Sequence, residues 1–161
     1  MIMKGNDKVL RTLNHLLADE LTAINQYMVH SEMCDNWGYS RLHKAIEKQA
    51  IDEMHHAEWL IQRIIFLEGA PVVSNLNPIK IGHAVPEIVV NDEDSEISAV
   101  HAYNDAIRVA REVADEGSVG LLTKILRMEE GHLDWDEMQR AQIEQMGMKN
   151  YLTDQSEGVA S

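Results

Sequence analysis

The sequence predicts an all-α protein built as a four-helix bundle. Aromatic residues make up 5% of the chain and there are only three prolines, whereas 45% of the chain is hydrophobic. This composition favours helices over sheet. Apolar residues recur every three or four positions through four long stretches, as one buried face of each helix requires. All three prolines lie between the second stretch and the start of the third, which predicts one long connection there.

The first two helices are predicted from their apolar faces and from the residues that end them. The first covers residues 6–33 and is ended by Gly38 and the tryptophan before it. The second begins near Ser40 and stops at Gly69 and Pro71, since glycine and proline commonly follow a helix C-terminus.

The connection after the second helix, residues 69–83, is long for a compact domain. A single crossover that runs the length of a bundle explains such a segment, and it makes the second and third helices parallel.

The remaining helices are predicted with less defined ends. The third begins between Pro86 and Asp92, because proline suits a first helical turn, and it runs to about Glu116, where Gly117 breaks it. The fourth continues to Gly147. Residues 148–155 form a short fifth helix outside the bundle.

The charge of the chain excludes some partners. Lys and Arg number 14 and Asp and Glu number 27, so the net charge is 14 minus 27, or −13. Such a surface repels nucleic-acid phosphates and anionic lipid, and it suits metal cations better. A length of 161 residues predicts a single domain over residues 1–161.

Cysteine content and hydropathy predict a cytoplasmic protein. The only cysteine, Cys34, excludes an internal disulfide framework and any four-cysteine metal site. The N-terminus has no apolar segment typical of a signal peptide, and no run of 18 apolar residues predicts a membrane helix.

The two halves of the chain carry one pattern at a constant offset. Glu20 and Tyr27 in the first half correspond to Glu96 and Tyr103 in the second. A Glu-x-x-His pair with a tryptophan three positions later follows each of these glutamates at the same distance along the chain. These residues are Glu53, His56 and Trp59 in the first half, and Glu129, His132 and Trp135 in the second. Each half is therefore predicted to be the same helical hairpin.

This repeat predicts a dinuclear metal site. Residues three apart in a helix project from nearly one face, so each Glu-x-x-His pair presents a carboxylate and an imidazole together. The predicted ligands and catalytic residues are Glu20, Glu53, His56, Glu96, Glu129 and His132. Burying four unpaired carboxylates would cost on the order of several kcal/mol per ion, and two divalent cations neutralise them. These ligand types favour iron or manganese, and zinc also accepts them.

The other aromatic and histidine residues receive simpler roles. Tyr27 and Tyr103 lie two turns after a predicted ligand on the same face, so their hydroxyls are expected to bond carboxylates around the site, with core packing as the alternative. Trp59 and Trp135 are expected to form walls and core. The remaining histidines lack such partners and are expected at the surface or in the core; they are His15, His30, His43, His55, His83 and His101.

These residues resemble the bacterioferritin family over nearly the whole chain, from residues 3–5 to residues 151–152. Three motifs carry the resemblance: ELTAINQY at residues 20–27, IDEMHHA at residues 51–57 and EEGHLDW at residues 129–135. The resemblance implies a ferritin-like four-helix bundle with one long crossover and a short fifth C-terminal helix.

The resemblance also implies roles for the ligands. Glu53 and Glu129 would bridge two irons, Glu20 with His56 would complete one position, and Glu96 with His132 the other. The implied activity is that of a ferroxidase: two Fe(II) are oxidised by dioxygen or hydrogen peroxide. The Fe(III) mineral would be stored in a hollow homo-oligomeric shell of twenty-four subunits built from twofold dimers. An electron-donor ferredoxin for iron release is a further implied partner.

Met54 matches the haem-ligating methionine of the family. It follows Glu53 by one residue, about 100° round the helix, so it is expected to point away from the metal site. The resemblance implies that it faces a partner subunit. Two such methionines would ligate one shared haem; packing at a dimer interface is the alternative. At Lys48 and Gln49 the chain departs from members that carry His and Glu beside Asp52 and bind an extra iron on the inner surface.

Two other functions are compatible with the sequence. The first is a di-iron peroxidase of the rubrerythrin type, in which iron is a resident cofactor and is not stored; the absence of a cysteine-rich electron-transfer domain disfavours it. The second is a haem-binding assembly protein in which Met54 is the primary site and the bundle is a scaffold.

Overall fold

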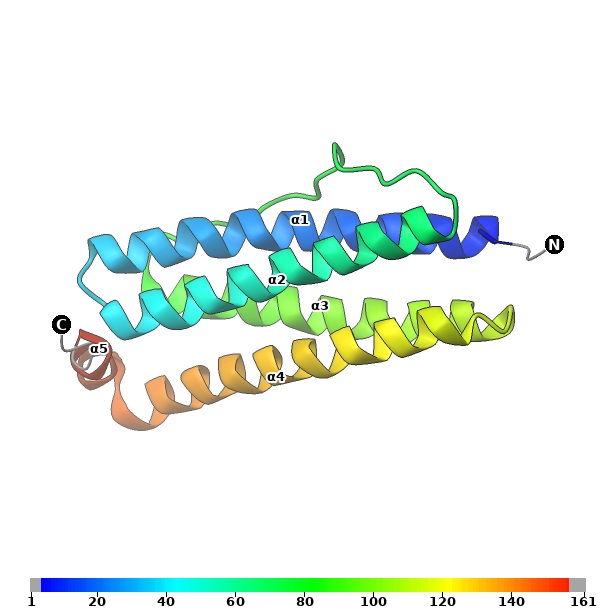
Figure 1. Cartoon of the computed structure of the whole chain (residues 1–161). Coiled ribbons are helices and arrows are strands. Elements are labelled where there is room, and N and C mark those ends of the chain that lie inside the picture. The colour runs from blue at the N-terminus through cyan, green and yellow to red at the C-terminus, as the bar shows by residue number, and fades with distance from the viewer. Residues whose placement is uncertain (1–3, 157–161) are drawn as a thin grey trace.

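The computed structural model describes residues 4–156, which form five helices (Figure 1). In chain order they are α1 (Asp7–Asn36), α2 (Ser40–Phe66), α3 (Val85–Glu112), α4 (Glu116–Met146) and α5 (Met148–Ser156). α1 pairs with α2 and α3 pairs with α4 as two hairpins, and α1 also packs on α3. The predicted four-helix bundle with one long crossover and a short fifth helix is confirmed. Residues 1–3 and 157–161, which the predicted domain includes, lie outside the described residues.

Local sequence signals explain where α1 begins and ends. The side-chain oxygen of Asn6 accepts hydrogen bonds from the backbone N–H groups of Lys8 and Val9, at 3.0 and 3.2 Å, and so caps the helix. Gly38 adopts a φ of 86°, which other residues rarely adopt, and the chain turns there into α2. Within residues 4–156, no helix is long and apolar enough to span a bilayer.

The crossover, residues 67–84, runs along α1 (Figure 1). Three α1 side chains one turn apart, Thr22, Gln26 and His30, accept hydrogen bonds from its backbone N–H groups at 2.9, 3.1 and 3.0 Å. Each bond satisfies a backbone group that has no helical or strand partner. These contacts fix the crossover over one side of the bundle, with α2 and α3 parallel as predicted.

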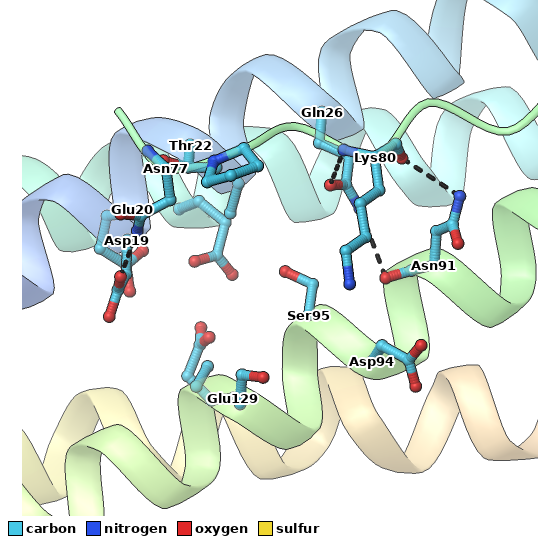
Figure 2. A pocket seen from close by; sticks show the side chains of 15 residues that line it. Asp19, Glu20, Thr22, Gln26, Asn77, Lys80, Asn91, Asp94, Ser95 and Glu129 are labelled. Carbon is cyan, nitrogen blue, oxygen red and sulfur yellow. Dashed lines mark hydrogen bonds between the residues drawn. The ribbon is translucent and has the colours of Figure 1, made fainter. Parts of the chain in front are cut away.

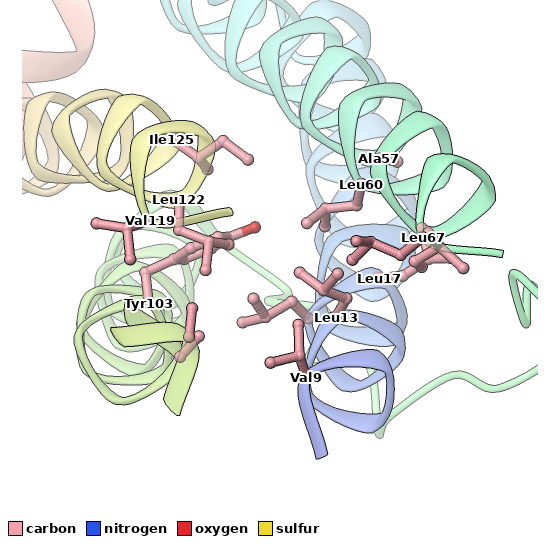
Figure 3. Packing of buried hydrophobic residues seen from close by; sticks show 14 residues of the cluster. Val9, Leu13, Leu17, Ala57, Leu60, Leu67, Tyr103, Val119, Leu122 and Ile125 are labelled. Atoms are coloured by element: carbon pink, nitrogen blue, oxygen red, sulfur yellow. The ribbon is translucent and has the colours of Figure 1, made fainter. Parts of the chain in front are cut away.

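Two apolar clusters lie at the two ends of the bundle. One joins residues of all four long helices and includes Leu13, Leu60, Tyr103 and Leu122 (Figure 3). The other includes Tyr151 of α5, which is fully buried. The predicted metal ligands lie along the helices between these two clusters, so apolar packing at both ends holds a polar middle in place.

The connection between α3 and α4 differs from the prediction. α3 begins at Val85, just before the predicted range, and ends at Glu112, and the turn contains Ala114 with a φ of 57°. Gly117 does not break the helix, since it lies in the first turn of α4. A Cβ there would approach the guanidinium of Arg63 to 2.6 Å, so this glycine makes room for an interhelical contact.

Candidate metal centre

The six predicted ligands converge from all four long helices into the middle of the bundle. Glu20 comes from α1, Glu53 and His56 from α2, Glu96 from α3, and Glu129 and His132 from α4. Every one of them is buried, and the most exposed, His132, has only 8% of its surface accessible. Positions this deeply buried in an amphipathic helix usually carry apolar side chains. A buried carboxylate is costly unless an opposite charge or a metal ion lies beside it.

The ligand atoms form two groups that share two residues. One oxygen or nitrogen from each of Glu20, Glu53, His56 and Glu129 lies within 4.8 Å of the others. The same holds for Glu53, Glu96, Glu129 and His132. Glu53 and Glu129 belong to both groups, so the geometry is suited to two adjacent cations that share these two carboxylates.

The histidine rings face these glutamates with their Nδ1 atoms. His56 Nδ1 lies 3.0 Å from Glu129 Oε1 and 3.3 Å from Glu20 Oε2. His132 Nδ1 lies 2.9 Å from Glu53 Oε1 and 3.5 Å from Glu96 Oε1. The two rings are 6.3 Å apart between centroids.

Each of the six residues also has one buried polar atom without a hydrogen-bond partner. These atoms are Glu20 Oε2, Glu53 Oε1, His56 Nδ1, Glu96 Oε2, Glu129 Oε1 and His132 Nδ1. Unsatisfied buried polar atoms are uncommon, and six that point to one place suit coordination to metal.

Burial and mutual repulsion shift the pKa values of these groups in the metal-free protein. Burial first, and then the charge of a neighbouring glutamate, raises the pKa of both Glu53 and Glu129 well above the usual range. Burial alone would lower the pKa of His56 and of His132, but close contact with the negatively charged glutamates raises the pKa of both to about 9. Protons therefore occupy the centre at neutral pH when no cation does.

The two tyrosines hold the terminal glutamates across the bundle. The hydroxyl of Tyr27, on α1, donates to Glu96 Oε1 at 2.5 Å, and that of Tyr103, on α3, donates to Glu20 Oε1 at 2.7 Å. The expected hydrogen bond from each tyrosine hydroxyl to a carboxylate is therefore confirmed. In each case the carboxylate belongs to the candidate ligand of the other hairpin. Each bond leaves the second oxygen of the glutamate free to face the centre.

A cavity of about 240 Å³ leads from the surface to this centre. Buried Glu20, Glu53 and Glu129 line this access cavity, together with exposed residues of α3 and of the crossover such as Asp94 and Lys80. Figure 2 shows the carboxyl groups of Glu20 and Glu129 on its inner side. A small ion or molecule can thus reach the glutamates without passing through the apolar clusters.

Two contacts of the histidines were not predicted from the sequence. His132 Nε2 lies 2.9 Å from Asp52 Oδ2, and His56 Nε2 lies 3.3 Å from Met128 Sδ. Asp52 also contacts Lys48 Nζ at 3.2 Å. Asp52 and Met128 differ in residue type, so the comparison of the two halves by identity did not select them.

The remaining predicted residues lie away from the centre. Met54 is on α2 with 44% of its surface exposed, so its side chain is not enclosed by this chain. His30 is a core residue whose Nδ1 lies 2.8 Å from Asp92 Oδ1. His43 lies beside Glu32 and Glu47 near the surface, in a further group of metal-ligand types that the sequence analysis did not single out.

Comparison with known proteins agrees with this geometry. Residues 10–146 match the model of the ferritin-like domain family. The chain is 42% identical over 154 residues to a bacterial ferritin of Synechocystis sp., covering 95% of this chain and 99% of that protein. It is 39% identical to a bacterioferritin of Brucella melitensis, covering 92% of each, and 38% identical to one of Mycobacterium leprae, covering 92% of this chain and 94% of that protein.

The chain belongs to the bacterioferritin family. The resemblance inferred from its motifs is thereby confirmed, and it extends over the whole bundle and not only over the ligand motifs.

For this bacterioferritin family member, we expect cation binding to release protons. Both histidines have a pKa of about 9 in the metal-free centre and must lose a proton to bind metal. At pH 7, loading both positions with Co(II) should release at least about two protons per subunit, and affinity should rise as pH is raised toward 9. Calorimetric titration in two buffers of different ionisation enthalpy measures this release. His56→Gln should reduce it and the exposed neighbour variant His55→Gln should not; equal release in both would contradict the expectation.

Proposed function

We propose that this protein is a ferroxidase that stores iron. The observation that carries the proposal is the pair of ligand groups that share Glu53 and Glu129. Two cations held side by side by common carboxylates are suited to a two-electron reaction, because each Fe(II) supplies one electron to the same oxidant.

The reaction balances with the groups present. Two Fe(II) become two Fe(III), and dioxygen takes the two electrons with two protons to give hydrogen peroxide. If hydrogen peroxide is the oxidant, it takes two electrons and two protons to give two waters. The glutamates and histidines hold the metal substrate, and the tyrosines orient Glu20 and Glu96. The access cavity admits ions and oxidant.

Storage is supported by family membership and by charge. The bacterioferritin relationship covers the length of a complete family member, and we propose a homo-oligomeric shell of twenty-four subunits with a mineral interior. A net charge of −13 per subunit favours ferrous cations over anions near such a shell. We place the protein in the cytoplasm, with a ferredoxin as electron donor for iron release.

A haem shared between two subunits is the second part of the proposal. Met54 fits a haem ligand because it is an exposed residue of α2, on a different side of the helix from buried Glu53. Exposed Ile51, three residues earlier on the same helix, adds apolar surface beside it. A haem held by two methionines has a raised reduction potential and can take up and pass on electrons.

Replacing a shared glutamate should slow the oxidation of Fe(II). Glu129→Gln keeps the shape of the side chain but removes its charge, and we expect the rate of Fe(II) oxidation by oxygen to fall at least about tenfold. Glu130→Gln is the matched control, since Glu130 is adjacent and exposed. Absorbance of Fe(III) measures the rate, and size-exclusion chromatography verifies assembly. Unchanged oxidation in assembled Glu129→Gln protein would refute the assigned centre.

Iron loading separates storage from a resident di-iron peroxidase. A storage protein should continue to take up and retain iron beyond the two ions per subunit that the centre can hold. We expect aerobic additions of Fe(II) to give soluble, protein-bound iron at tens of ions per subunit, measured by iron analysis of the chromatographed shell. Saturation at two would favour the rubrerythrin-type alternative.

Haem binding should depend on Met54 and not on the metal centre. Met54→Leu preserves volume but removes the sulfur ligand, so the Soret absorbance of the purified protein should be lost while Fe(II) oxidation remains. Met138→Leu, at a methionine of similar exposure on α4, should retain haem. Haem retained by Met54→Leu would show that another group ligates it.

A further inference from the structure

The two metal positions are related by the internal repeat, but the groups behind their histidines differ. Asp52 and Met128 occupy equivalent places in the two halves, each immediately before a shared glutamate. Each contacts the outer nitrogen of the histidine in the opposite hairpin: Asp52 Oδ2 lies 2.9 Å from His132 Nε2, and Met128 Sδ lies 3.3 Å from His56 Nε2. The two halves of the repeat therefore differ chemically at this position.

A carboxylate and a thioether do different things to a histidine ligand. A carboxylate only accepts hydrogen bonds, so Asp52 holds the proton of His132 on Nε2 and leaves Nδ1 free to bind metal. Its negative charge also makes the ring a stronger donor to the metal, and loss of such a partner typically lowers metal affinity about 10- to 100-fold. A thioether is a weak, neutral acceptor and gives His56 little of this support.

The lysines near these two groups correspond in the repeat, whereas buried Asp136, which interacts with Glu96 and His132, has the apolar Leu60 as its equivalent in the first half. Lys48 contacts Asp52 from four residues earlier, and its equivalent in the second half is Lys124, four residues before Met128. Lys124 Nζ lies 3.9 Å from the centre of the Trp59 ring. Both ammonium groups are at the surface, where their effect on the centre is weak. In direct contact with the outer ring nitrogens, the two positions therefore differ as carboxylate against sulfur.

The access cavity has the same asymmetry. Its lining contains Glu20 and both shared glutamates, but neither Glu96 nor either of the two histidines. His132 instead borders a separate surface cavity, of about 380 Å³, where Asp52 and Met128 also lie. Glu20 belongs to the same metal position as His56, whose outer nitrogen contacts only the thioether of Met128. This is therefore the position whose own glutamate lines the access cavity.

From these contacts we infer that the two metal positions are unequal, with Asp52 as a positioning residue for the tighter one. The position of Glu96 and His132 retains a divalent cation, and that of Glu20 and His56 exchanges it through the access cavity. This inference rests on the proposed function, since it requires that both positions bind metal. Its consequence is that one ion is held in place while successive ions pass through the other position.

The order of filling is the diagnostic measurement. Two cations that share carboxylates repel each other, so two binding steps would be separated even at equal positions. We therefore propose to load the full-length protein with one equivalent of Co(II) per subunit, crystallise it and measure the occupancy of each position by anomalous scattering. We expect occupancy to favour the Glu96 and His132 position by about 10- to 100-fold.

Exchanging the two supporting residues should reverse this preference. In the double variant Asp52→Met with Met128→Asp, the carboxylate lies behind His56, and the Glu20 and His56 position should fill first. Met128→Leu is the control and should leave the original order unchanged. If the double variant does not fold, Met128→Asp alone should bring the two occupancies close together.

The outcomes distinguish the inference from the proposed function. Equal occupancy in the unaltered protein, or a preference that Met128→Asp leaves unchanged, would overturn the asymmetry while a two-metal centre remained. Cobalt absent from both positions, with two equivalents added, would overturn the proposed function itself.

Discussion

The organisation of this bundle depends on the burial of four carboxylates at one place. Charges of one sign in a dry interior repel strongly, and glutamate is rarely fully buried unless it is paired or bound to metal. In the metal-free protein, Glu53 and Glu129 have raised pKa values and the histidines carry protons, so protons balance part of the charge. Divalent cations would take over that role, which ties the occupancy of the centre to the pH.

The rest of the structure allows the bundle to tolerate this polar middle. Apolar clusters on both sides supply the packing that the centre does not, and residues such as Leu13 and Leu60 in one cluster are fully buried. The crossover is held to α1 by Thr22, Gln26 and His30, and residues near its middle line the cavity that reaches the glutamates. The same segment thus completes the topology and borders the access route.

Near-symmetry of the two hairpins is the second organising feature. The candidate ligands and the tyrosines follow the repeat closely, so the two groups offer the same set of possible ligand atoms. Asp52 and Met128 depart from it. A pair of positions with equal ligands but unequal support provides a way to keep one ion and exchange the other within a single centre.

The sequence alone was enough to predict four long helices, the internal repeat and the six candidate ligands that the fold brings together. Helical periodicity is local, and residues three apart share a face in any α-helix, so the Glu-x-x-His pairs could be recognised without coordinates. The turn between α3 and α4 was predicted wrongly because its left-handed residue is Ala114, whereas the sequence offered Gly117 as the natural break. The contacts across the hairpins, such as Tyr103 with Glu20 and Asp52 with His132, could be seen only in the folded protein. These contacts depend on the axial register and rotation of one hairpin against the other, which side-chain packing sets and no local pattern encodes.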